Sequence, residues 1–207
     1  MARQISNTAA RAAGASRLVR EAQRLSIKTS LGAPPELDRL IHERIRLGMV
    51  TIGITALASA VIASLRPQVV WWVGVWGLEA LCAFAVGASA VFWKARKVQT
   101  PLFSRPGRKF VLGLSPPMVA AAVLSMVIYR AGVFTLLPGV WLLLYGAGVV
   151  TAGAYSVKVV PIMGLCFMFA GIAALLCPPA WANAIMAASF GGLHILFGTI
   201  IARRYGG

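Results

Sequence analysis

The chain has 207 residues, of which 59% are hydrophobic and 12% charged, with 20 Lys and Arg against 5 Asp and Glu and a formal net charge of +15. This composition excludes an ordinary soluble domain, in which about a quarter of the residues are charged. Three cysteines in a chain of this length exclude a disulfide-stapled secreted domain, and a basic nucleic-acid-binding domain would carry less apolar sequence. The sequence therefore predicts an all-α polytopic membrane protein.

Residues 1–46 are polar and basic, and we interpret them as a cytoplasmic tail with amphipathic helices. Within 15–28, Arg17, Arg20 and Arg24 share one helical face, which suits a helix lying on anionic headgroups. A solvated tail that only enforces topology accounts for the same charges equally well. A mitochondrial transit peptide is a minor alternative, because the tail is rich in arginine and poor in acids.

The stretch 36–48 predicts a second amphipathic helix, which leads directly into the first membrane span. Its Leu37-Asp38, Ile41-His42-Glu43 and Arg46-Leu47 strings resemble the opening helix of small winged-helix regulators. The resemblance covers about 13 residues and ends where the apolar sequence begins. No recognition helix or wing follows it, so it implies no DNA-binding function.

The rest of the chain, 47–207, predicts a six-helix transmembrane bundle, because six segments approach the roughly 20 apolar residues that a bilayer core requires. Pro116-Pro117 sets one boundary, since proline is tolerated in the first turn of a helix but not in its interior. Ser115 then caps the third span, and residues 110–114 lie at the interface. The predicted spans are about 47–65, 69–93, 115–134, 138–155, 159–177 and 180–202.

The basic residues predict the orientation of these spans. Residues 1–46 hold nine Lys and Arg and the loop 94–109 holds six; Lys158, Arg203 and Arg204 bring the total on this side to 18 of 20. Only Arg66 and Arg130 lie on the other side. Under the positive-inside rule, both termini are therefore cytoplasmic.

Glycine recurs every seven residues in each of the last three predicted spans. Seven residues are close to two helical turns, so each set lies on one face, and small residues let membrane helices approach closely. We predict that these three spans pack together through their glycine faces, although 21 glycines in an apolar chain also produce some coincidences. The glycines are Gly139, Gly146 and Gly153, then Gly164 and Gly171, then Gly191 and Gly198.

Glu79 and His194 are the candidate ligand or proton site. They lie ten and fourteen residues into the second and sixth spans, which places them about 15 and 21 Å below the outer ends. Ionisable residues at this depth usually face protein or water. The two side chains can meet if their helices are neighbours, and then form a proton relay or a site for a cationic ligand. The alternative is a structural pair, or two residues bonded separately to Ser, Thr or backbone.

Other chemistry is not expected. Cys82, Cys166 and Cys177 lack metal-ligand spacing, and the sequence has no phosphate-binding glycine loop and no nucleophile–base pair. We therefore predict no metal, no cofactor and no enzyme activity. The tryptophans at predicted span ends are interpreted as interfacial anchors, and they are Trp71, Trp72, Trp93 and Trp181.

A second resemblance covers most of the chain from Ser115 onward. Four stretches resemble an uncharacterised family of bacterial multi-span membrane proteins. They are 137–148 (LPGVWLLLYGAG), 159–164 (VVPIMG), 190–194 (FGGLH) and the later Ala202-Arg203-Arg204. The genes of that family often lie beside a small winged-helix regulator. The resemblance implies a bacterial membrane protein and no particular activity.

These patterns predict a multi-pass protein of the bacterial inner (plasma) membrane that binds, senses or regulates without catalysis. The alternative is a small proton-coupled transporter using Glu79 and His194. The expected partners are anionic lipid headgroups and a cytoplasmic protein that meets the tail or the loop 94–109, whereas nucleic acid is not expected. The sequence does not predict an oligomeric state.

Overall fold

The computed structural model describes residues 35–97, 105–154 and 157–205, and all regular elements within these ranges are helical. Six of these helices are long and apolar enough to cross a membrane, which indicates a multi-pass membrane protein. The prediction of an all-α chain with six such helices is confirmed for this part of the chain. The predicted helix over 15–28 lies outside the described residues.

The first five membrane-length helices are separate elements. They are α2 (Pro35–Ser64), α3 (Val69–Lys97), α4 (Arg105–Ala131), α5 (Leu137–Gly153), which follows the short η1 (Phe134–Leu136), and α6 (Val159–Leu176).

The sixth membrane-length helix is built from four consecutive pieces, one of them π-helical. They are η2 (Pro179–Trp181), α7 (Ala182–Met186), the π-helical segment η3 (Ala187–Leu193) and α8 (His194–Tyr205). Segments of π-helix are rare and occur frequently at functional sites.

The predicted start of the third span at Ser115 is wrong. Helix α4 begins at Arg105 and runs through Pro116 and Pro117 without ending. Because Pro117 has no N–H, it cannot bond to the carbonyl of Gly113 four residues earlier. That carbonyl instead accepts a hydrogen bond of 2.7 Å from the Thr151 hydroxyl of α5. A neighbouring helix thus supplies the missing donor, which is how membrane helices tolerate internal proline.

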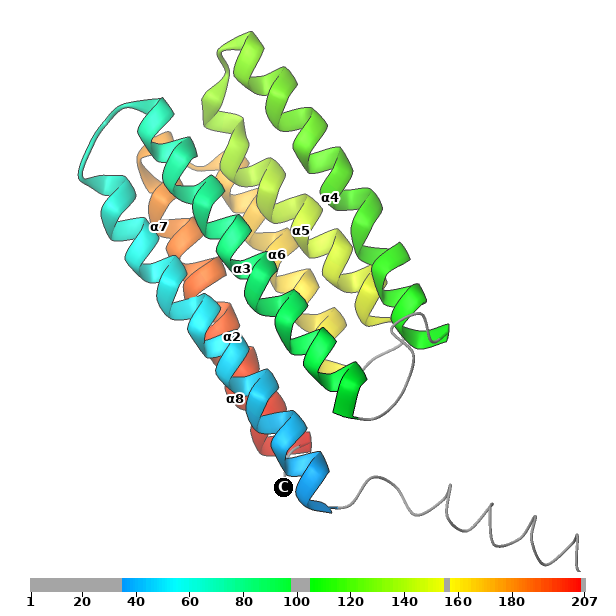
Figure 1. Ribbon diagram of the computed structural model, residues 1–207. Coiled ribbons are helices and arrows are strands. Elements are labelled where there is room, and N and C mark those ends of the chain that lie inside the picture. Colours follow the sequence, from blue (N-terminus) through cyan, green and yellow to red (C-terminus); the bar gives the residue numbers. More distant parts are fainter. Residues whose placement is uncertain (1–34, 98–104, 155–156, 206–207) are drawn as a thin grey trace, which may run out of the picture. The chain divides into compact units, whose positions relative to one another are not determined.

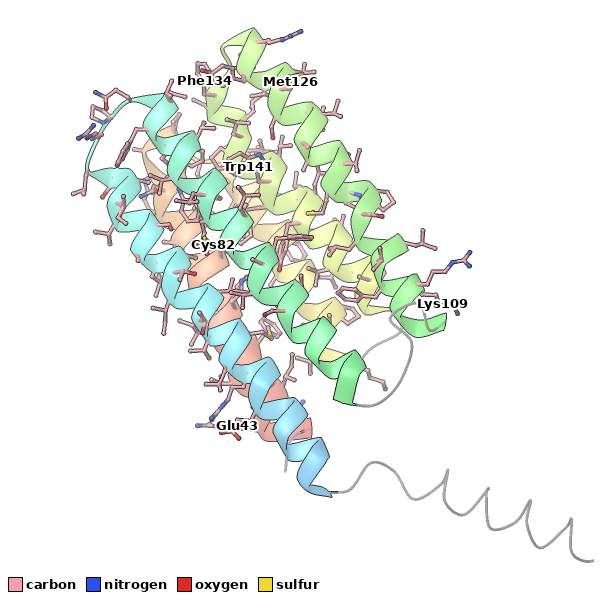
Figure 2. The ribbon with its side chains drawn as sticks, viewed as in Figure 1. Glu43, Cys82, Lys109, Met126, Phe134 and Trp141 are labelled. Atoms are coloured by element: carbon pink, nitrogen blue, oxygen red, sulfur yellow. The ribbon has the colours of Figure 1, made fainter. Side chains whose placement is uncertain are left out.

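Residues 41–207 form one compact unit, and the contacts between its helices define their order. Helix α4 packs on α5, and α5 packs on α6 (Figure 1). Helix α3 lies against α2 through side-chain hydrogen bonds and against α5 through stacked Trp72 and Trp141 rings. The largest fully buried side chains include Leu142 of α5 and Phe167 of α6. The outer face of α4 is apolar and exposed, for example at Met126 (Figure 2).

Helices α5 and α6 approach so closely that their glycines face the partner's backbone. A Cβ atom added to Gly146 would lie 2.6 Å from the Gly164 carbonyl oxygen, and one added to Gly164 would lie 2.7 Å from that of Gly146. Gly139 and Gly171 face each other in the same reciprocal way, with both distances at 3.0 Å. Gly153 lies against the start of α6. Side chains at these positions would force the two backbones apart.

The glycines of the sixth helix face a different neighbour from the one we predicted. An added Cβ on Gly191 would meet Leu57, and one on Gly198 would meet Met49, and both of these residues belong to α2. In return, a Cβ on Gly53 of α2 would lie 2.7 Å from the Gly191 carbonyl oxygen. The seven-residue spacing marks a close-packing face in each helix, but the sixth helix turns that face to the first span instead of the fourth or fifth. Spacing defines a face and does not define its partner.

Candidate functional site

Glu79 lies on α3 and turns its carboxylate toward α2. Thr55 Oγ1 lies 2.9 Å from one carboxylate oxygen and Ser59 Oγ lies 3.2 Å from the other. Thr55 and Ser59 are four residues apart and therefore share one face of α2. The Glu79 side chain is 7% exposed, so the hydroxyls replace much of the water that a carboxylate requires.

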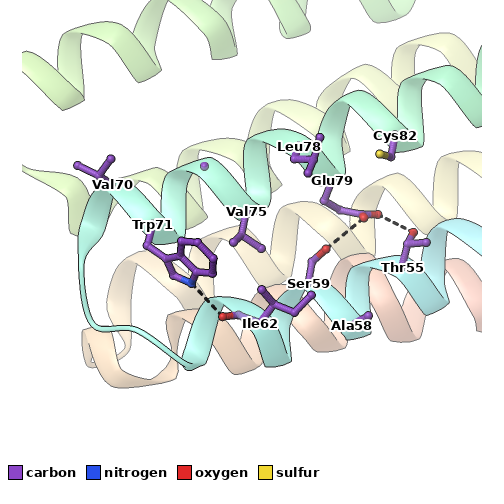
Figure 3. Close-up of a pocket in the computed structure, with 11 residues that line it drawn as sticks. Thr55, Ala58, Ser59, Ile62, Val70, Trp71, Val75, Leu78, Glu79 and Cys82 are labelled. Atoms are coloured by element: carbon purple, nitrogen blue, oxygen red, sulfur yellow. Dashed lines mark hydrogen bonds between the residues drawn. The ribbon is translucent and has the colours of Figure 1, made fainter.

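A groove lies between α2 and α3 and reaches Glu79 (Figure 3). Its volume is about 710 Å³, within the range of small-molecule sites. Eleven residues line it, and only Thr55, Ser59, Glu79, the Trp71 indole and the Cys82 thiol bring polar atoms. The other lining residues are Ala58, Ile62, Val70, Gly74, Val75 and Leu78.

The open side of this groove is apolar. Leu78 is 63% exposed and Val70 is 68% exposed, and both lie on the rim. In a helix of membrane length, such a surface faces lipid tails. With these helices in a bilayer, the groove would open toward lipid, and Glu79 lies beside Thr55 and Ser59.

His194 lies at the start of α8 in an aromatic cluster and is 4% exposed. Its Nε2 lies 2.9 Å from the Tyr145 hydroxyl, and its Nδ1 lies 2.9 Å from the Phe190 carbonyl oxygen. Because a backbone carbonyl only accepts, Nδ1 donates to Phe190, and in a neutral imidazole Nε2 accepts from Tyr145. The ring also packs edge-on against Phe167 of α6. Both nitrogens of His194 are thus used within the protein.

The two candidate residues therefore bond to different partners. Glu79 bonds to hydroxyls of α2, while His194 bonds to Tyr145 of α5 and to its own helix. One turn from each of them, Trp76 and Phe190 face each other with ring centroids 6.2 Å apart. The second and sixth spans are thus neighbours, as the predicted contact requires, but among the described residues no hydrogen bond joins Glu79 to His194.

Sequence analysis missed Asn183, which joins three helices. Its Oδ1 accepts from the indole N–H groups of Trp72 and Trp76 at 3.2 and 3.1 Å, and its Nδ2 donates to the Ala60 carbonyl oxygen at 2.7 Å. Trp72 is accordingly half-buried and bonded within the protein, which differs from its interpretation as an interfacial anchor. The signal was available, because an amide inside an apolar span usually bonds to another helix.

Within the described ranges, no group of three or more His, Cys, Asp or Glu side chains could hold a metal ion. The three cysteines are free, and Cys82 is exposed at the Glu79 end of the groove (Figure 3). No protein-family model, curated protein or solved structure matches this chain.

Proposed function

We propose that this chain is a multi-pass protein of the bacterial inner membrane that binds a small ligand within the bilayer and does not catalyse a reaction on it. The observation that carries the proposal is the groove between α2 and α3, which combines a lipid-facing opening with a carboxylate. Keeping an ionisable group at this depth costs free energy, and such groups generally serve a function. Ligand binding accounts for both the opening and the cost.

The distribution of charge supports the proposed location and orientation. Eighteen of the 20 Lys and Arg residues lie in segments that six spans place on one side, which is the cytoplasmic side under the positive-inside rule. This basic face would attract anionic headgroups. We propose that the tail or the loop 94–109 meets a cytoplasmic protein, which would connect ligand binding to a sensing or regulatory role.

The test is native mass spectrometry of the full chain extracted from membranes in a mild detergent. Gly74 lines the groove and an added Cβ there meets nothing within 4 Å, so Gly74→Phe fills the groove without a backbone clash. Gly77 on the same helix has equally open surroundings but does not line the groove. Gly77→Phe is therefore the matched control.

We expect a small molecule bound one to one in the wild type and in Gly77→Phe, and its loss in Gly74→Phe. A wild-type protein without any bound mass, or one whose bound mass persists in Gly74→Phe, would contradict intramembrane binding in this groove.

The π-helical segment that ends beside His194 favours a second candidate, a small proton-coupled transporter that uses Glu79 and His194. We rank it second because both nitrogens of His194 are bonded to partners other than Glu79. Reconstituted vesicles provide the test: an imposed pH gradient should dissipate faster with wild-type protein than with Glu79→Gln if transport is the function, and equally fast if it is not.

A further inference from the structure

When Glu79 is ionised, the groove carries a negative charge that its lining does not balance. None of the eleven lining residues is basic, and Glu79 is the last acidic residue in the chain, following Glu43. The side chains that bond to Glu79 are the hydroxyls of Thr55 and Ser59, which donate hydrogen bonds but bring no positive charge. A carboxylate in an apolar setting interacts strongly with an opposite charge, because the low dielectric weakens screening. The missing element at this end of the groove is a cation.

The hydroxyls also leave the carboxylate incompletely bonded. Thr55 has one hydroxyl hydrogen, yet its Oγ1 lies within bonding distance of three acceptors: Glu79 at 2.9 Å, the Thr51 carbonyl at 3.1 Å and the Ile52 carbonyl at 3.0 Å. Ser59 contributes a single further donor at 3.2 Å. An ionised carboxylate can accept about four hydrogen bonds. Glu79 therefore retains acceptor capacity for a ligand that carries N–H donors.

The groove holds its one acidic group toward one end. Thr55, Glu79 and Cys82 lie at one end, while Val70 and Trp71 lie at the other (Figure 3). Val70 and Cys82 are twelve residues apart on α3, a rise of about 18 Å. The guanidinium of Arg66 lies over the Trp71 ring at 4.7 Å, so the far end already has a positive charge. An acid at one end and an aromatic ring with a basic neighbour at the other fit a cation at Glu79 and a hydrocarbon chain directed along the apolar lining toward the Trp71 ring.

We propose that the groove binds a lipophilic amine, with its protonated nitrogen paired to Glu79 and its hydrocarbon chain lying between α2 and α3. This inference rests on the proposed intramembrane binding function and specifies its ligand class. The ammonium group supplies both the positive charge and the N–H donors that Thr55 and Ser59 do not provide. Charge-assisted hydrogen bonds of this kind are about twice as strong as neutral ones.

A second copy of this chain does not offer the same complement. The Lys and Arg residues beyond position 47 lie near span ends or in the segments between spans, so a second copy brings no basic side chain to the depth of Glu79. A lipid acyl chain could occupy the apolar end but would not engage the carboxylate. A free amine on an apolar chain satisfies both ends of the groove.

The experiment uses the full chain in nanodiscs of zwitterionic phosphatidylcholine, with dodecylamine that carries a diazirine at the carbon farthest from nitrogen. We expect photolabelling that excess unlabelled dodecylamine prevents, with adducts on peptides that contain Ile62 or Val70. Dodecanol should not compete. Glu79→Gln should weaken competition by about tenfold or more, which corresponds to about 1.4 kcal/mol. Glu43→Gln, the same change at an exposed glutamate outside the groove, should label as the wild type does.

Gly74→Phe should abolish the competed labelling while Gly77→Phe keeps it, which tests the groove without altering Glu79. Unchanged labelling of Glu79→Gln, or equal competition by dodecanol, would overturn the amine assignment. If native mass spectrometry finds a groove-dependent ligand but the amine probe labels nothing specifically, the ligand class is wrong and intramembrane binding stands. A dimer that disappears in Gly74→Phe, without competed labelling, would assign the groove to a second copy instead.

Discussion

Two helix pairs in this bundle are joined in opposite ways. Between α5 and α6, glycines bring the backbones together until an added Cβ on Gly146 would meet a carbonyl oxygen of the partner. Between α2 and α3, the links include hydrogen bonds from Thr55 and Ser59 to Glu79 and from the Trp71 indole to the Ile62 carbonyl, and a groove of about 710 Å³ remains open. Gly74 of α3 faces empty space.

The difference shows that apolar helices of the same chain can associate in two ways in a membrane. Lipid tails are as apolar as leucine, so membrane helices associate through close van der Waals contact or through polar links. Close contact excludes any ligand from the α5–α6 interface. Polar links hold α2 and α3 at a greater separation, and the space between them can receive a ligand. The first pair is therefore the scaffold, and the second pair is where we propose the function.

The strongest test of this contrast is Gly146→Leu. The leucine side chain cannot fit against the Gly164 carbonyl, so we expect a loss of about 3 kcal/mol or more in the free energy of unfolding, or no folded protein. Thermal unfolding of the purified protein measures the effect. Gly77→Leu, which introduces the same side chain into open space on α3, should remain close to the wild type. Equal stability of Gly146→Leu and the wild type would remove the distinction between the two pairs.

A second test addresses the polar side of the comparison. Asn183→Leu removes the acceptor of Trp72 and Trp76 and the donor to the Ala60 carbonyl, so we expect a loss of about 2 kcal/mol in the free energy of unfolding. Ala184→Leu places the same side chain at an exposed neighbouring position and serves as the control. If both variants unfold at the same temperature, Asn183 does not hold these helices together.

A smaller effect is expected where α4 meets α5. Thr151→Val removes the donor to the Gly113 carbonyl and should cost about 1 kcal/mol in the free energy of unfolding, typical of a hydrogen bond between membrane helices. Restoring a backbone N–H with Pro117→Ala gives that carbonyl a partner within α4. Thermal unfolding of both single variants and the double variant measures this effect. We expect Thr151→Val to lower the free energy of unfolding less when Pro117→Ala is also present than when Pro117 is kept. Additive costs would mean that Thr151 does not compensate for the proline.

The sequence predicted the membrane-length helices well because length and hydropathy are local properties. The first, second, fourth, fifth and sixth predicted spans match membrane-length apolar segments that begin and end within a few residues of the expected positions. The third failed at Pro116-Pro117, because the donor that makes an internal proline tolerable belongs to Thr151 on another helix. A rule about proline in one helix cannot include a hydroxyl on its neighbour.

The candidate site was predicted only in part. An acidic residue in an apolar span is conspicuous, so Glu79 could be found from the sequence, while its partners Thr55 and Ser59 resemble many other small polar residues. Depth placed His194 near Glu79, but depth says nothing about which way a side chain points. Asn183 was equally visible as an amide in an apolar span, but the sequence does not show which helices it joins.

The sequence by itself determined that the chain is helical, that six helices are long and apolar enough to cross a membrane, and which faces carry small residues. These features follow from hydropathy and from periodicity along the chain. Only the tertiary structure decided which faces meet, with Gly146 against Gly164 and Gly191 against α2. The groove beside Glu79 also depends on the tertiary structure, because the separation of two helices depends on the side chains that both of them bring to the interface.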